Sequence, residues 1–174
     1  MKRKTVLALL LWVLVPSLVW AHYHWCSNEH GSISISMSGI VTRGSQLTYL
    51  FGIVPPKGHS LGLVIFSTGA MLSGSLETGG TFDSAGSSFN VISKGNYGEP
   101  KGVIFSGTFD RPITWTLIDK TGEDLVFKIH GDLIGQTYTG ATVTGETSQI
   151  IVTTEGQLGE GIGHIAIGKM DVAP

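Results

Sequence analysis

The chain has 174 residues, and its 13 acidic and 11 basic side chains give a formal net charge of −2 at pH 7. The absence of excess positive charge argues against nucleic acid and anionic membranes as main partners. Its 25 glycines, with many serines and threonines, favour turns and exposed β-structure over helix. A chain of this length buries enough surface to fold as one domain.

Residues 1–21 have the layout of a secretory signal peptide. Three basic residues at 2–4 precede an apolar run over 6–15, and residues 19–21 suit a cleavage point. The apolar run is short for a membrane span, and no second candidate follows it. We therefore expect cleavage after Ala21, a secreted or periplasmic protein, and no transmembrane anchor.

The segment 22–31 follows the expected cleavage point. Residues at a new chain terminus are often solvated and flexible, so we expect a flexible N-terminal segment here. A single β domain is predicted to follow over 32–174.

From residue 32 onward, apolar and polar side chains alternate in short runs, which is the pattern of half-buried strands. These runs are 32–38, 46–53, 103–109, 113–117 and 124–130. The denser apolar stretch 62–66 fits a strand covered on both faces. Segments rich in Gly, Pro, Asn and Asp separate the runs as turns. We expect an all-β fold of about ten strands, either an antiparallel β-sandwich or a β-barrel.

Three segments in the second half of the chain resemble a known group of proteins. They are Gly102–Phe109, Pro112–Leu117 and Gly140–Gly145, which consist of strand and turn sequence rich in Gly and Thr. They resemble small secreted β-rich bacterial proteins of the PEP-CTERM-associated type. The resemblance implies a secreted β fold and brings no catalytic residue with it. The sequence 171–174 departs from the sorting tail of that group, so we expect release rather than sorting to a membrane.

Cleavage after Ala21 would create a histidine-rich amino terminus. The α-amine and imidazole of His22 could chelate Cu(II), with a more distant histidine as third ligand. His24 would instead allow a square-planar site with the amine and two backbone amides. Both arrangements suit the tetragonal preference of Cu(II). The candidates for the distant ligand are His59, His130 and His164. The competing interpretation is a solvated tail that binds copper only incidentally.

Cys26 is the only cysteine, which excludes an intrachain disulfide. In an oxidising compartment its thiol could link two copies of the chain through a disulfide. The alternative is a buried side chain that packs as a small apolar residue, which is the usual behaviour of free cysteine.

The sequence contains no readable set of catalytic residues. Its acidic residues fall mostly at strand ends, where exposed turn residues normally lie, and no Gly-x-Ser-x-Gly elbow precedes a helix. A small barrel enzyme, such as an isomerase, cyclase or hydrolase, would need an acid or His130 to point into an enclosed cavity.

Several aromatic side chains are candidates for contact with a sugar or a partner: Tyr23, Trp25, Tyr97 and Tyr138. Tyr97 is the strongest candidate because it lies in a glycine-flanked loop, where a rigid β-scaffold would expose it. Trp115 shares the parity of Ile113 and Leu117, so we place it in the core.

These observations favour a secreted, non-catalytic β-domain protein. Its partner would be a carbohydrate or another component of the cell envelope or matrix. A copper-binding protein that uses His22 and His24 is one alternative, and a small β-barrel enzyme is another.

Overall fold

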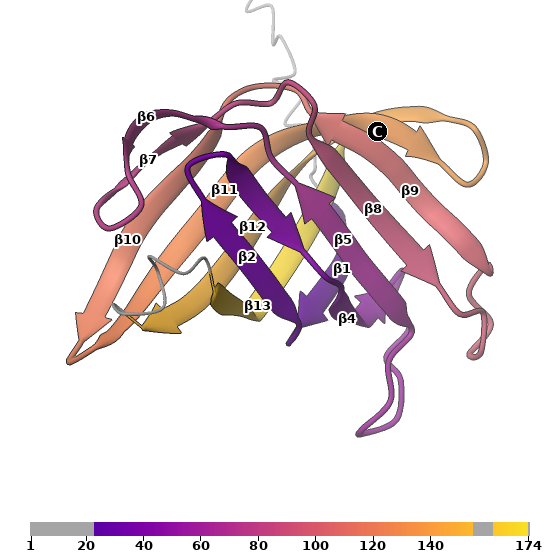
Figure 1. Cartoon of the computed structure of the whole chain (residues 1–174). Coiled ribbons are helices and arrows are strands. Elements are labelled where there is room, and N and C mark those ends of the chain that lie inside the picture. The colour runs from indigo at the N-terminus through magenta and orange to yellow at the C-terminus, as the bar shows by residue number, and fades with distance from the viewer. Residues whose placement is uncertain (1–22, 155–161, 174) are drawn as a thin grey trace, which may run out of the picture.

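The computed structural model describes residues 23–154 and 162–173, and this part of the chain is all-β (Figure 1). The expected signal peptide and His22 lie outside the described residues. Within the described ranges, no helix is long and apolar enough to cross a membrane. The strands are β1 (Tyr23–Glu29), β2 (Ser32–Ser36), β3 (Gly39–Thr42), β4 (Ser45–Leu50), β5 (Gly62–Ser67), β6 (Met71–Ser75), β7 (Gly79–Phe82), β8 (Ser88–Ser93), β9 (Gly102–Phe109), β10 (Ile113–Thr121), β11 (Asp124–Thr137), β12 (Thr142–Thr154) and β13 (Ile162–Ala173).

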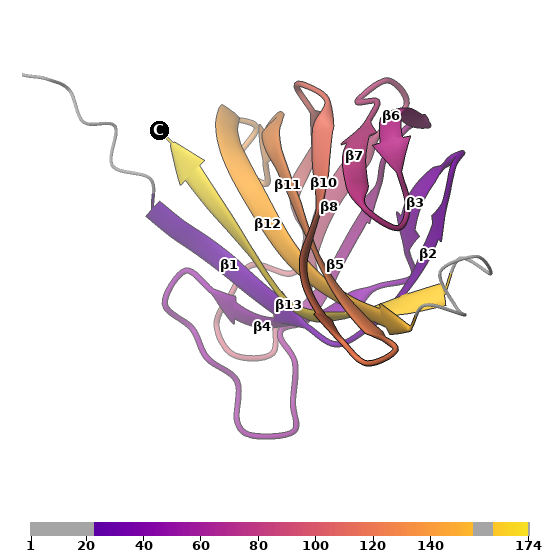
Figure 2. The same cartoon turned by 90° about the vertical axis from the view of Figure 1, so that its left-hand side faces the viewer.

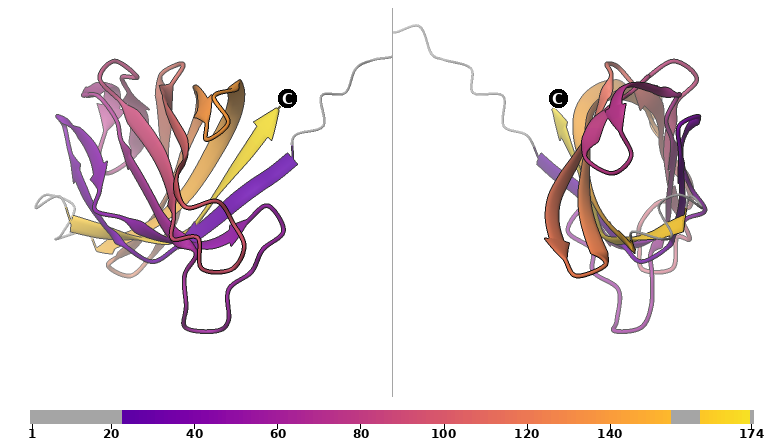
Figure 3. Two further views of the ribbon diagram at one scale, coloured as in Figure 1. Left: turned by 90° about the vertical axis from the view of Figure 1, so that its right-hand side faces the viewer. Right: turned by 60° about the vertical axis from the view of Figure 1, so that its left-hand side comes forward.

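Eight of these strands pair into a closed antiparallel ring, so the fold is a barrel and not a sandwich. The order around the ring is β1, β4, β5, β8, β9, β11, β12 and β13. Strand β13 then pairs with β1, and these two strands lie side by side in Figure 2. The right-hand view of Figure 3 looks into the ring. Because the ring is closed, its eight strands do not end in the two free edges that an open sheet would expose.

The remaining strands branch from the ring. Strands β2 and β3 form a second bridge between β13 and β5. The long strand β11 pairs with β9 over 133–137 and with β10 over 124–130, so the wall of the barrel forks along β11. Beyond β10, β7 and then β6 continue the sheet.

Residues 23–29, which we expected to be flexible, form β1, so the β domain begins at Tyr23 and not at residue 32. Strand β1 pairs with β13 on one side and with β4 on the other. The register shifts between His24 and Cys26, and again between Ser27 and Asn28. In the first shift Trp25 is an extra residue of β1, whereas the second skips Thr48 of β4. The extra residue interrupts the alternation of inward and outward side chains, and the buried Asn28 is polar, so the sequence pattern conceals this strand.

Large aromatic side chains fill the core. Those that are almost completely buried are Phe66, Phe82, Phe89, Phe105, Trp115 and Phe127. The ring of Trp115 stacks on Phe127 with 4.0 Å between the centroids, and its indole N–H donates to the carbonyl oxygen of Leu76 at 2.9 Å. The prediction that Trp115 lies in the core is therefore confirmed.

Four polar side chains, which we call the interior amide cluster, are buried together with these apolar residues. It consists of Asn28, Ser45, Thr147 and Gln149. The Asn28 amide donates to Ser45 Oγ at 2.8 Å and to Gln149 Oε1 at 2.9 Å. Gln149 in turn donates to Asn28 Oδ1 at 3.2 Å and to Thr147 Oγ1 at 2.9 Å. The cluster thereby satisfies polar atoms that would otherwise destabilise the core.

Cys26 is also fully buried, so it presents no exposed thiol for a disulfide between two copies. Its position agrees with the alternative of a small apolar packing residue. Burial raises the pKa of the Cys26 thiol to about 12, and the negative charge of Asp171 adds to this effect.

The buried thiol predicts a loss of stability in alkali. The unfolded chain releases the proton near its ordinary pKa of 9.0, whereas the folded chain holds it to about 12. The contribution of the protonated thiol to the free energy of unfolding is therefore complete below pH 9. Above pH 9 it declines by about 1.4 kcal/mol per pH unit. Cys26→Ala should remove this decline. Chemical unfolding at several pH values between 7 and 10.5 checks it, and parallel profiles for the two proteins would contradict the prediction.

Candidate functional site

His24, the described member of the expected copper pair, has partners for both ring nitrogens. Its Nδ1 lies 2.9 Å from Asp171 Oδ1, and its Nε2 lies 2.9 Å from Ser27 Oγ. The ring also stacks on Tyr49, with 4.9 Å between the centroids. A copper ion bound through this imidazole would replace one of these hydrogen bonds. Because His22 lies outside the described residues, the pair stays a prediction.

Asp171 links His24 to Lys169. Its Oδ2 accepts a hydrogen bond from Lys169 Nζ at 2.7 Å. Burial alone would raise the pKa of Asp171, but the hydrogen bonds from Lys169 and His24 outweigh burial and hold the pKa below its ordinary value. The hydrogen bond to Asp171 also raises the pKa of Lys169. His24 therefore belongs to a charged surface network on β1 and β13.

The other candidate histidines lie apart in the fold. His59 lies in the exposed loop between β4 and β5. His130 lies on β11 between the inward-facing Ile129 and Gly131, and its Nδ1 lies 3.1 Å from Ser148 Oγ. It thus faces outward, and not into the barrel as the enzyme alternative requires. The side chain of His164 is outside the described part of the structure.

Tyr97, the expected ligand-contact aromatic, is half-buried and packs against the core. The loop is organised by Glu99, which accepts backbone N–H groups of Asn96 at 3.1 Å and Tyr97 at 2.8 Å. Burial would raise the pKa of Glu99, but hydrogen bonds from its own backbone N–H, from these two N–H groups and from the Ser93 hydroxyl lower it below its ordinary value. The loop is therefore organised around a buried carboxylate, and Tyr97 packs against the core instead of projecting freely into solvent.

Two of the other candidate aromatics meet at one end of the barrel. Trp25 of β1 and Tyr138, which follows β11, flank Phe51, which follows β4. The ring centroids are 4.9 Å apart for Trp25 and Phe51, and 6.4 Å apart for Phe51 and Tyr138. With Thr137, Thr139 and Ala141 they line a cleft of about 460 Å³, which we call the aromatic cleft. Trp25 also packs edge-on against buried Phe105, so the cleft rests directly on the core.

Phe51 has an unusual backbone conformation. Its φ is 51°, and His30 is the only other residue besides glycine with a positive φ in the described ranges. A turn holds it there, since Leu50 and Ile53 exchange backbone hydrogen bonds and the Phe51 N–H donates to the Trp25 carbonyl. For a bulky side chain this conformation costs about 1–3 kcal/mol and is concentrated at functional sites. The turn leaves residue Phe51 39% exposed beside Tyr138, which is 53% exposed.

Sequence reasoning identified Trp25 and Tyr138 but missed Phe51. The shared parity of Leu47, Tyr49 and Phe51 predicts instead that Phe51 belongs to a strand over 46–53. In the structure β4 ends at Leu50. The following Gly52, with a φ of 88°, was the available signal for a turn at this point.

No family model matches this chain, and neither does any curated protein or solved structure. The resemblance to proteins of the PEP-CTERM-associated type therefore stays a prediction.

Proposed function

We propose that this protein is a secreted, non-catalytic β-barrel that binds a neutral carbohydrate of the cell envelope or matrix in the aromatic cleft. The observation that carries the proposal is the conformation of Phe51. The chain holds this ring in a costly backbone geometry, partly exposed, between Trp25 and Tyr138. Exposed aromatic rings fixed on a rigid scaffold are a common design for binding.

The chemistry of the cleft matches that of a sugar. A pyranose ring offers apolar C–H faces that pack on aromatic rings, and its hydroxyl rim needs polar partners. The hydroxyls of Thr137 and Thr139 lie 2.7 Å apart in the cleft, and each retains capacity for a further hydrogen bond. None of the described lining residues is charged at neutral pH, which favours a neutral sugar over a uronic acid. The volume of about 460 Å³ lies in the range of small-molecule sites.

The same lining favours binding over catalysis. Hydrolysis of a glycosidic bond normally needs a pair of carboxyl groups on either side of the bond. The described lining of the cleft offers three aromatic rings, two threonines and an alanine, without a carboxyl or imidazole group.

Tryptophan fluorescence provides a direct test. From residue 22 onward the chain has two tryptophans, and Trp115 is buried, so a change on titration reports Trp25. Among hexamers of glucose, mannose and N-acetylglucosamine, we expect at least one to give saturable binding. Tyr138→Ala and Phe51→Ala should each weaken binding about tenfold, because an aromatic contact contributes about 1 kcal/mol or slightly more.

Leu72→Ala is the matched control, since Leu72 is exposed to about the same extent as Tyr138 but lies on β6 and not in the cleft lining. It should bind like the unmodified protein. The proposal is wrong if no neutral hexamer binds, or if both aromatic variants bind as tightly as the Leu72 variant.

A further inference from the structure

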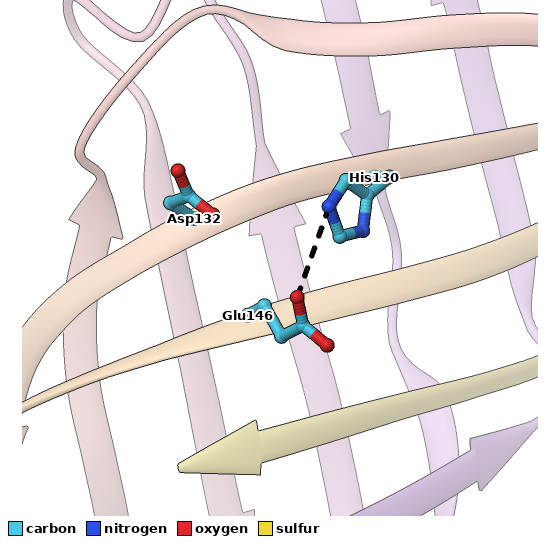
Figure 4. Close-up of side chains that lie close together, drawn as sticks. All are labelled: His130, Asp132 and Glu146. Carbon is cyan, nitrogen blue, oxygen red and sulfur yellow. Dashed lines mark ion pairs between the residues drawn. The ribbon is translucent and has the colours of Figure 1, made fainter. Parts of the chain in front are cut away.

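Outside the aromatic cleft, His130, Asp132 and Glu146 gather on the outer face of β11 and β12 (Figure 4). One ligand-capable atom from each of the three side chains lies within 4.8 Å of the others. His130 and Asp132 are two residues apart on β11, so they share a face. Asp132 is directly opposite Glu146 on β12. The register of one strand pair therefore assembles all three.

The orientation of His130 leaves one ring nitrogen directed at this group. Nδ1 lies 3.1 Å from Ser148 Oγ, and Nε2 lies 3.9 Å from Glu146 Oε2. The second distance is too long for a hydrogen bond, so the two atoms face each other across a gap. A histidine that binds metal normally has its other ring nitrogen fixed by a hydrogen bond, as Ser148 does here.

The strand register also concentrates negative charge. Asp132 on β11, Glu146 on β12 and Asp171 on β13 are direct neighbours across the sheet. Like charges in this arrangement destabilise a sheet. Asp171 is neutralised by Lys169 at 2.7 Å, and Asp132 lies 3.7 Å from the exposed guanidinium of Arg111. A cation between Asp132 and Glu146 would relieve the remaining repulsion.

We propose that His130, Asp132 and Glu146 form a binding site for Zn²⁺. Zinc accepts imidazole nitrogen and carboxylate oxygen, and three protein ligands with one water complete its usual four-coordinate shell. All three side chains are half-buried, so rotation about their side-chain bonds can bring the ligand atoms to coordination distance. Arg111 has to leave Asp132, and an exposed ion pair of this length contributes little.

Calorimetric titration of the chelator-treated full protein with Zn²⁺ tests the site. We expect one ion to bind per chain. His130→Ala and Glu146→Gln should each weaken binding by more than tenfold, and Ser148→Ala by about tenfold, because that hydroxyl only orients the imidazole. Arg111→Ala should bind zinc more tightly, a gain that a merely structural role for the cluster would not produce.

Asp110→Asn is the matched control. It removes one carboxylate that also contacts Arg111 but lies outside the proposed ligand set, so zinc affinity should be unchanged. His24→Ala separates the amino-terminal histidines from this site and should also leave the affinity unchanged. The proposal fails if His130→Ala and Glu146→Gln bind zinc like the unmodified protein while remaining folded by circular dichroism, or if His24→Ala abolishes binding.

Discussion

Replacing Trp115 with alanine is expected to lower the free energy of unfolding by about 4 kcal/mol. The side chain is only 1% exposed, and its ring packs on Phe127 and edge-on against Phe82. Its loss leaves a large cavity and also removes the indole N–H from the carbonyl of Leu76. These contacts fasten the branch of β6, β7 and β10 to the rest of the core.

Urea unfolding followed by far-UV circular dichroism measures the effect without relying on tryptophan fluorescence. Ile118→Ala on the same strand is the control, because Ile118 is 50% exposed and its truncation should change stability by about 0.5 kcal/mol or less. Equal losses in the two variants would show that Trp115 does not anchor this branch.

The interior amide cluster should show strong coupling between Asn28 and Gln149. Either Asn28→Leu or Gln149→Leu alone should cost about 3 kcal/mol, because the remaining amide loses partners inside the core. The double variant should cost clearly less than the sum. Ser45 and Thr147 would still donate to the backbone carbonyls of Glu29 and Lys169, so no hydroxyl donor is stranded.

A double-mutant cycle from urea unfolding measures this coupling, which should reach about 2 kcal/mol. The Gln149 side chain has room for its amide only because residue 168 is glycine, since any Cβ at that position would overlap the amide. Strictly additive losses would mean that each amide contributes to stability independently of its partner.

The sequence predicted the elements that depend on local pattern. The alternation of residues identified the all-β class, and parity placed Trp115 in the core. The alternation did not identify β1, because the extra residue Trp25 interrupts it and the buried position 28 holds a polar asparagine. Barrel closure was equally inaccessible, because it depends on pairing between β1 and β13 at opposite ends of the chain.

The candidate sites were only partly visible for the same reason. Sequence parity puts His130 and Asp132 on one face, but Glu146 joins them only through the register of β11 with β12. The sequence identifies Trp25 and Tyr138 separately as candidates for contact with a sugar or a partner. Their meeting at Phe51 follows from the path of three chain segments that are distant in sequence.

The pairing of β1 with β13 also determines when the barrel can form. Tyr23 of β1 lies opposite Val172 of β13, so the ring can close only after β13 has been synthesised. Until then, β1 and β12 each present an unpaired edge to other chains. Contacts of such sequence separation make folding slow. We therefore expect a chain that lacks β13 to aggregate more readily than one that contains it, because β13 covers both of these edges.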